Sequence, residues 1–169
     1  MSLRFRTATL FVLAHSLLAS VATAQGGNPL RGIMVSGGIA TFRAEGEGIW
    51  YPQFHLAAAG RSGWGFDGGI GVYSGDGSGV LVDVAAAHVD ASAQSAVGFM
   101  VMFGPTVVVG EGGGALGATV GGAVLVRLAP HVGLRVDVSP KLFFSSDGVE
   151  PAIAFAFSLT SLPGGWSGK

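Results

Sequence analysis

The fold is decided by the segment Val132-Gly133-Leu134-Arg135-Val136-Asp137-Val138-Ser139, which alternates between large aliphatic residues and residues that are small or charged. Successive side chains of a β-strand point to opposite faces of the sheet, so this strand has one apolar face and one polar face. In a water-soluble barrel the apolar face points inward. In a barrel that spans a membrane it contacts lipid, and the polar face lines the interior. The choice between these orientations decides the class of protein.

The composition favours the membrane orientation. Charged residues make up 11% of the chain, whereas about 25% is usual in soluble proteins. Hydrophobic residues make up 49%, so little charge is left to cover a water-exposed surface. The nearest approach to a spanning helix after residue 24 is the 12-residue segment 115–126, which is shorter than the roughly 20 residues that such a helix needs. Strands are therefore expected to cross the membrane.

The first 24 residues have the features of a secretory signal peptide. Arg4 and Arg6 precede an apolar stretch over residues 10–22, and Ala22-Thr23-Ala24 forms a small-residue cleavage site. We therefore expect export and cleavage before Gln25.

The mature chain is expected to form one domain, a barrel over residues 25–162, followed by a tail over residues 163–169. It contains no cysteine, which excludes disulfides and thiolate metal sites. Seven Lys and Arg remain against ten Asp and Glu once Arg4 and Arg6 are removed. This acidic balance argues against a nucleic-acid partner.

Turn-forming residues divide the mature chain into eight segments with strand-like patterns. The predicted strands are 32–42, 49–59, 64–73, 80–89, 96–109 (broken internally by Pro105), 115–128, 132–144 and 151–160. Most have about the 9–11 residues that a tilted strand needs to cross a bilayer, and their number is even. The sequence therefore predicts an all-β fold, an eight-stranded antiparallel up-and-down transmembrane β-barrel.

The polar faces of these strands carry three carboxylates and three cations. Unpaired charges are costly both in a dry core and on a lipid-facing surface. The narrow lumen of an eight-stranded barrel requires small side chains and compact ion pairs. We therefore predict a plugged lumen. Its ion-pair network is predicted to contain Asp67, Asp83, Arg127, Arg135, Asp137 and Lys141.

Aromatic residues gather near the predicted strand ends, where girdles are expected at the lipid headgroups. The girdle at the outer ends is predicted to contain Phe42, Trp50, Tyr51, Tyr73, Phe143 and Phe144. The girdle at the periplasmic ends is predicted to contain Trp64, Phe99 and Phe157.

A resemblance to a known family rests on the signal peptide and on residues 121–137, which read Gly121-Gly122-Ala123-Val124-Leu125-Val126-Arg127-Leu128-Ala129-Pro130-His131-Val132-Gly133-Leu134-Arg135-Val136-Asp137. This segment resembles the penultimate hairpin of the small Gram-negative outer-membrane β-barrel proteins of the OmpA/OmpX type. The resemblance implies a location in the bacterial outer membrane. It also implies three partners, namely the lipid bilayer, lipopolysaccharide and the outer-membrane assembly machinery. One departure is the end of the chain, where the family commonly has an aromatic residue that closes the last strand and this chain has a tail.

No motif with catalytic or metal-ligand spacing occurs in the chain, so the sequence predicts no catalytic residue, no metal site and no cofactor. We expect a structural or surface-interaction protein rather than an enzyme. Two alternatives stay open. One is a soluble periplasmic β-barrel that binds an apolar ligand. The other is a small outer-membrane enzyme that modifies lipid, for which His55 is the candidate residue because it shares the polar face with Tyr51 and Gln53.

Overall fold

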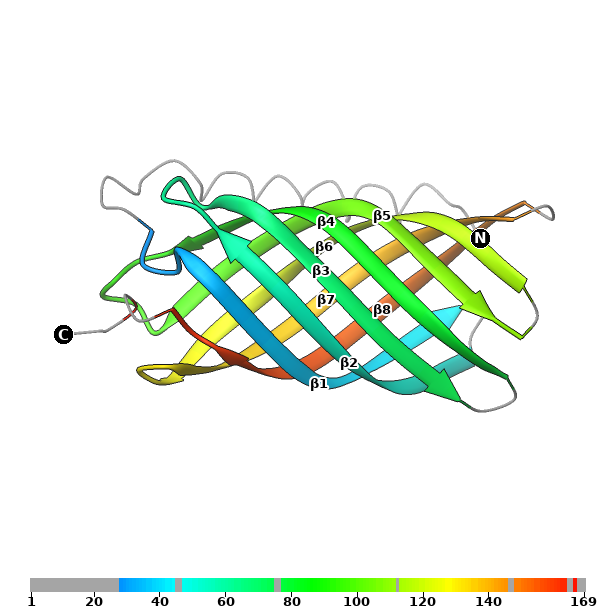
Figure 1. Ribbon diagram of the computed structural model, residues 1–169, viewed down its shortest axis with the longest axis horizontal. Coiled ribbons are helices and arrows are strands. Elements are labelled where there is room, and N and C mark those ends of the chain that lie inside the picture. The colour runs from blue at the N-terminus through cyan, green and yellow to red at the C-terminus, as the bar shows by residue number, and fades with distance from the viewer. Residues whose placement is uncertain are drawn as a thin grey trace, which may run out of the picture.

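A computed structural model of the chain shows a closed barrel of eight antiparallel strands (Figure 1). It describes residues 28–44, 47–74, 77–111, 113–145, 148–163 and 166. The predicted signal peptide and most of the predicted tail lie outside these residues. Within the described ranges no helix is long and apolar enough to span a membrane.

The strands follow one another around the barrel in chain order. They are β1 (Gly32–Ala44), β2 (Glu47–Ala59), β3 (Trp64–Ser74), β4 (Ser78–Ala91), β5 (Val97–Gly110), β6 (Gly113–Ala129), β7 (Val132–Ser145) and β8 (Gly148–Ser161). Each strand pairs with the next, and β1 also pairs with β8, with Ile39 opposite Phe157. The predicted fold class is therefore confirmed.

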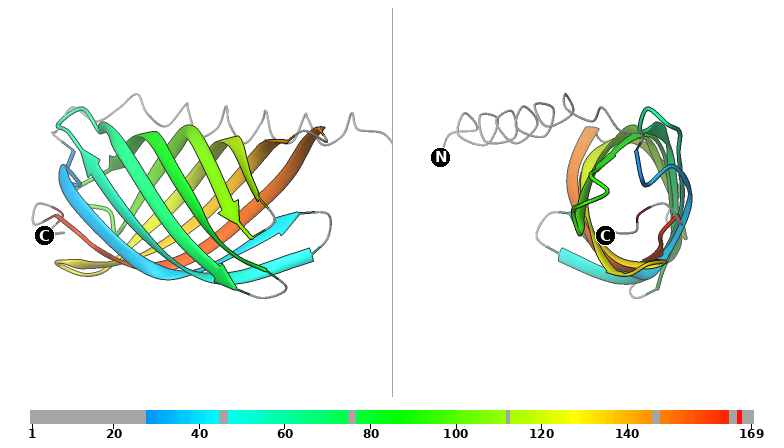
Figure 2. Two further views of the ribbon diagram at one scale, coloured as in Figure 1. Left: turned by 45° about the vertical axis from the view of Figure 1, so that its right-hand side comes forward. Right: turned by 90° about the vertical axis from the view of Figure 1, so that its left-hand side faces the viewer.

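The barrel has two distinct ends. We call the one that holds the start of β1, the end of β8 and the turns 60–63, 92–96 and 130–131 the termini end, and the opposite one the loop end. The right panel of Figure 2 looks into the termini end. Several strands reach further toward the loop end than predicted, since β6 begins at Gly113 and β8 at Gly148. Backbone pairing continues there through glycine and polar residues that lack the apolar alternation used to predict strands.

The predicted break at Pro105 is wrong, because β5 runs without interruption through that residue. Proline has no N–H to donate to the ladder. The pairing with β4 accordingly passes from Thr106 directly to Phe103. At the adjacent Gly104, an added Cβ would lie 2.1 Å from the carbonyl oxygen of Val84. The absence of a side chain lets the two backbones approach closely enough to keep the strand in the wall.

The outer surface of the barrel is apolar. Large side chains exposed on it include Ile33, Val35, Ile39, Phe54, Ile70, Val84, Phe103, Val120, Leu142, Phe155 and Leu159. The apolar face predicted for residues 132–139 thus points outward, with Val132 and Val138 exposed, and Arg135 and Asp137 of its polar face are buried in the lumen.

The lumen contains three layers of side chains. The layer at the termini end is an apolar cluster of Leu30, Met34, Ala57, Ala59, Ala85, Ala87, Val89, Ala91, Met100, Met102, Ala123, Leu125, Leu162 and Trp166. The middle layer is polar and charged. The layer at the loop end is a second apolar cluster built on Ala40, Tyr51, Leu81, Phe143 and Ala156, against which Phe42 and Tyr73 pack.

Candidate functional site in the barrel lumen

The centre of the polar layer is Arg135, which is 1% exposed. Arg135 and Asp137 share the inner face of β7 because they are two residues apart, and Arg135 Nε donates to Asp137 Oδ1 at 2.8 Å. The guanidinium also donates to both carboxylate oxygens of Asp67, at 2.7 and 3.1 Å. A two-pronged geometry of this kind gives a strong, well-oriented ion pair.

The pair formed by Asp67 and Arg135 spans the lumen. Asp67 lies on β3 and Arg135 on β7, and these strands are four apart in a ring of eight, hence on opposite walls. Two charged side chains in a dry interior stabilise each other only if both find such partners. The pair therefore ties the two walls together across the barrel.

His55 is the member of this group that the sequence analysis did not place in the network. Its Nδ1 lies 2.9 Å from Asp67 Oδ2. Gly69 is paired opposite His55, and an added Cβ at that position would lie 2.8 Å from the imidazole Cε1. The signal was available in the sequence, because a glycine two residues from Asp67 on the same inward face leaves room for a neighbouring ring.

A second ion pair lies closer to the loop end. Lys141 Nζ on β7 donates to Asp83 Oδ1 on β4 at 2.5 Å, and it lies 3.5 Å from the hydroxyl of Thr119. Lys141 is fully buried, whereas the Asp83 side chain is 18% exposed. Five of the six predicted lumen charges therefore form two ion-paired groups.

The sixth predicted charge, Arg127, joins neither group among the described residues. Arg127 lies where the β6–β7 register shifts, at the termini end of the barrel and away from the polar layer. Its Nη1 donates instead to the backbone carbonyl of Trp166 at 3.1 Å. The face of the strand was predicted correctly, but the height along the barrel separates Arg127 from the carboxylates.

The predicted aromatic girdles need a correction. Trp50, Trp64, Phe99, Phe144 and Phe157 are exposed on the outer face. Tyr51 and Phe143 are buried inside the barrel, and Phe42 and Tyr73 pack partly buried against the same interior cluster. Neighbours in a strand point to opposite faces, so Trp50 and Tyr51 cannot both face lipid, nor can Phe143 and Phe144. These residues were selected by their position along the strand, without regard to the side of the sheet to which each side chain points.

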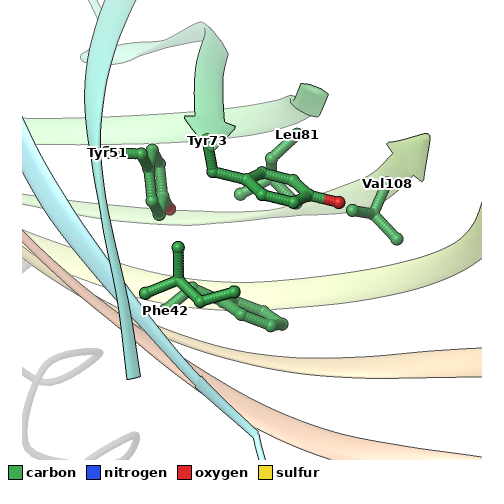
Figure 3. Close-up of a pocket in the computed structure, with 6 residues that line it drawn as sticks. Phe42, Tyr51, Tyr73, Leu81 and Val108 are labelled. Atoms are coloured by element: carbon green, nitrogen blue, oxygen red, sulfur yellow. The ribbon is translucent and has the colours of Figure 1, made fainter. Parts of the chain in front are cut away.

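The inward-pointing rings surround a small apolar cavity at the loop end. Phe42, Tyr51 and Tyr73 turn toward a common space with Leu81 and Val108 (Figure 3). Its volume is about 80 Å³. Glycine makes room for the rings here too, since an added Cβ at Gly71 would lie 2.4 Å from the ring of Tyr51. A cavity of this size is well below the roughly 300 Å³ of typical small-molecule sites.

The polar layer itself encloses very little space. A cavity of about 20 Å³ is lined by residues including Gln53, His55 and Lys141, which is room for about one water molecule. Beside it, Gln53 Nε2 and Asp137 Oδ2 are buried, and neither has a hydrogen-bond partner in the described part of the chain. Over the described ranges no group of three or more His, Asp or Glu side chains could hold a metal ion. The layer is thus arranged as a set of ion pairs rather than as a chamber for a substrate.

The closed eight-stranded barrel is the fold of the small outer-membrane β-barrel proteins. Solved structures with this fold include Neisserial surface protein A, at 14% identity over 76% of this chain and 93% of that chain, with a TM-score of 0.54. The attachment invasion locus protein Ail of Yersinia pestis matches at 15% identity over 78% and 98%, with a TM-score of 0.51. The N-terminal β-barrel domain of Pseudomonas aeruginosa OprF matches at 8% identity over 80% and 99%, with a TM-score of 0.55. No protein-family model matches the sequence, and a comparison with curated proteins finds no match.

Proposed function

We propose that this protein is a structural or surface-interaction barrel of the bacterial outer membrane, with a lumen closed by its own side chains. The proposal rests on the distribution of side chains in the barrel wall. Aliphatic and aromatic side chains are exposed on the outside, and ion pairs are buried on the inside. Exposed apolar surface on this scale is unfavourable in water and favourable in lipid. The structural neighbours are outer-membrane barrels, which supports the same location.

The closed lumen is supported by the contacts across it. The ion pair between Asp67 and Arg135 joins opposite walls, and the cavity beside it has a volume of only about 20 Å³. An ion that crossed this layer would have to separate buried charges, which is costly. We therefore infer that the barrel does not conduct in this conformation.

A role in surface interaction is supported by two of the neighbours, which are named as a surface protein and an attachment invasion locus protein. In this proposal the loop end faces the outside, where lipopolysaccharide is the immediate partner. The outer-membrane assembly machinery is the partner during insertion, and the bilayer surrounds the wall. The proposal assigns the protein no enzymatic activity.

Cell fractionation combined with a heat-modifiable gel shift tests the proposal. We expect the protein in the outer-membrane fraction, and we expect it to migrate differently in unheated and heated detergent because folded membrane barrels resist unheated detergent. Recovery in the soluble fraction after osmotic shock would overturn the proposal in favour of a periplasmic carrier. A change in lipid A or phospholipid on overexpression would instead establish a lipid-modifying enzyme if His55→Ala abolishes it while the variant keeps the gel shift of the folded barrel.

A further inference from the structure

Trp166, the last described residue, lies inside the barrel although it follows the last strand. Its side chain is 0% exposed and belongs to the apolar cluster of the termini end. The indole Nε1 donates to the carbonyl oxygen of Ser92 at 3.0 Å. A large aromatic side chain that is fully buried and hydrogen-bonded in this way occupies a defined position.

The indole of Trp166 makes its hydrogen bond on the side of the barrel opposite the last strand. Ser92 follows β4, whereas Trp166 follows β8, and these strands are four apart in the ring. Leu162 N donates to the carbonyl oxygen of His131 at 3.0 Å, and the Leu162 side chain is buried. Leu162 and Trp166 thus contact different sides of the barrel, Leu162 at the β6–β7 turn and Trp166 at the end of β4.

Arg127 on β6 also contacts Trp166. Its guanidinium donates to the carbonyl oxygen of Trp166 and lies 5.9 Å from the centre of the indole ring. This is the cation–π arrangement that stabilises an arginine over a tryptophan face. Arg127 therefore binds Trp166 instead of a carboxylate of the lumen.

The N-terminal end of the described chain closes the termini end of the barrel from another direction. Asn28 Nδ2 donates to the carbonyl oxygen of Val89 on β4 at 2.6 Å, and Leu30 is fully buried in the apolar cluster. In the end-on view of Figure 2 both coloured chain ends, blue and red, turn inward over the ring of strands.

The wall at this end is shaped to receive large side chains. The inward residues there include Ala57, Ala59, Ala85, Ala87, Ala91 and Ala123. The alanine side chains of β2, β4 and β6 leave space that close packing requires larger side chains to fill. The strands fill part of it with Met34, Val89, Met100, Met102 and Leu125, and Leu30, Leu162 and Trp166 complete the cluster.

We propose that the termini end of the barrel is a binding site for Leu162 and Trp166 of the chain's own C-terminal part, with the Trp166 indole as the anchor, and that these two side chains close the lumen at that end. The inference rests on the closed lumen of the proposed function, but not on the membrane location. It can therefore be tested on folded protein in detergent, so that failure of the plug and failure of the outer-membrane assignment are separate results.

The absence of cysteine from the sequence permits a direct accessibility test. Ala87→Cys places a thiol in the cluster that contains Trp166, and Ala156→Cys places one in the loop-end cluster. The rate of reaction with a small charged methanethiosulfonate reagent is measured on each. Trp166→Ala is expected to raise the reaction rate of the thiol at position 87 roughly 100-fold. The reason is that the protection of a buried thiol follows the free energy needed to expose it, and removal of the indole lowers that free energy. The reporter at position 156 should not change.

The matched control is Trp64→Ala, which removes an indole of the same end that is 53% exposed on the outer face. It should leave both rates unchanged. The heat-modifiable gel shift confirms folding of each variant. If Trp166→Ala does not fold, Arg127→Gln supplies the test, because it removes both contacts to Trp166 and should raise the rate at position 87 by about tenfold.

A chain truncated after Ser161 tests binding in trans. The reporter at position 87 should react fast in this chain, and a synthetic peptide of residues 162–169 should slow it, whereas the same peptide with Trp166→Ala should not. Equal rates at position 87 with and without Trp166, or equal effects of the two peptides, would overturn the proposal.

Discussion

The outer and inner faces of β6 carry different side chains. Leu116, Val120 and Val124 point outward and are exposed, with Val120 at 63%, whereas Thr119 and Ala123 point inward and are buried, with Thr119 at 3%. In a soluble protein the larger aliphatic side chains would occupy the buried face. The comparison teaches that packing in this barrel is inverted, so we expect its stability to depend on ion pairs inside and on lipid outside. The following predictions test these two contributions separately.

The largest effect is expected at Arg135 on the inner face. Arg135→Ala leaves Asp67 and Asp137 buried and without their main partner, and removal of one member of a buried ion pair costs about 3–5 kcal/mol. Urea unfolding of the barrel in lipid vesicles measures the loss. Arg61→Ala, which changes an exposed arginine in a turn, is the control and should have almost no effect. Equal losses in both variants would mean that the network contributes nothing to stability.

On the outer face, a charge at Val120 is expected to have the next largest effect. Arginine near the middle of a lipid-facing strand costs about 2–4 kcal/mol in a transmembrane barrel. Val120→Arg should therefore lower the stability of the vesicle-inserted protein in the same unfolding experiment, and Val120→Leu should not. A Val120→Arg barrel as stable as the parent would contradict contact of this face with lipid.

The second ion pair should matter less than the first. Lys141→Met leaves Asp83 without its cation, but the Asp83 side chain is 18% exposed and retains some contact with solvent. The expected loss is about 1–3 kcal/mol, which unfolding measurements beside Arg135→Ala can resolve. A loss that exceeds the loss in Arg135→Ala would show that the centre of the network lies at Lys141 instead.

The smallest predicted change is a gain in stability. Thr106 is fully buried, and its hydroxyl has no hydrogen-bond partner among the residues that the structure describes. Thr106→Val keeps the shape and removes the unpaired group, so stability should rise by up to about 1 kcal/mol. Thr119→Val is the contrasting change, because the Thr119 hydroxyl lies within reach of Lys141 and of the carbonyl oxygen of Pro140. It should destabilise the barrel, and a reversal of these two signs would contradict the hydrogen-bond assignment.

The sequence was sufficient for the strands and for their two faces because the side-chain period of a strand is fixed by backbone geometry. It was not sufficient for the pairing of Asp67 with Arg135, since contact across a barrel depends on which strands face each other. Arg127 was placed on the correct face but at the wrong height. Tyr51 was placed at the correct height but on the wrong face.

The contact of Trp166 with Ser92 likewise depends on which strands face each other across the closed ring. Nothing in the pattern of residues 162–166 predicts that Trp166 contacts Ser92, because this contact exists only once β8 and β4 stand opposite each other. The alanine-rich inner face at the termini end was visible in the sequence. It was interpreted as a requirement of a narrow lumen, whereas it also accommodates the chain ends.

Contact between the outer face and lipid can be measured most directly by quenching of tryptophan fluorescence with brominated acyl chains. One chain carries Phe103→Trp as its only tryptophan, with phenylalanine at positions 50, 64 and 166, and a second chain keeps only Trp166. Phe103 is exposed on the outer face and Trp166 is buried inside the barrel. In vesicles of brominated phosphatidylcholine, we expect strong quenching of the tryptophan at position 103 and little quenching of Trp166. Equal fluorescence of the first chain in brominated and unbrominated vesicles would contradict the account.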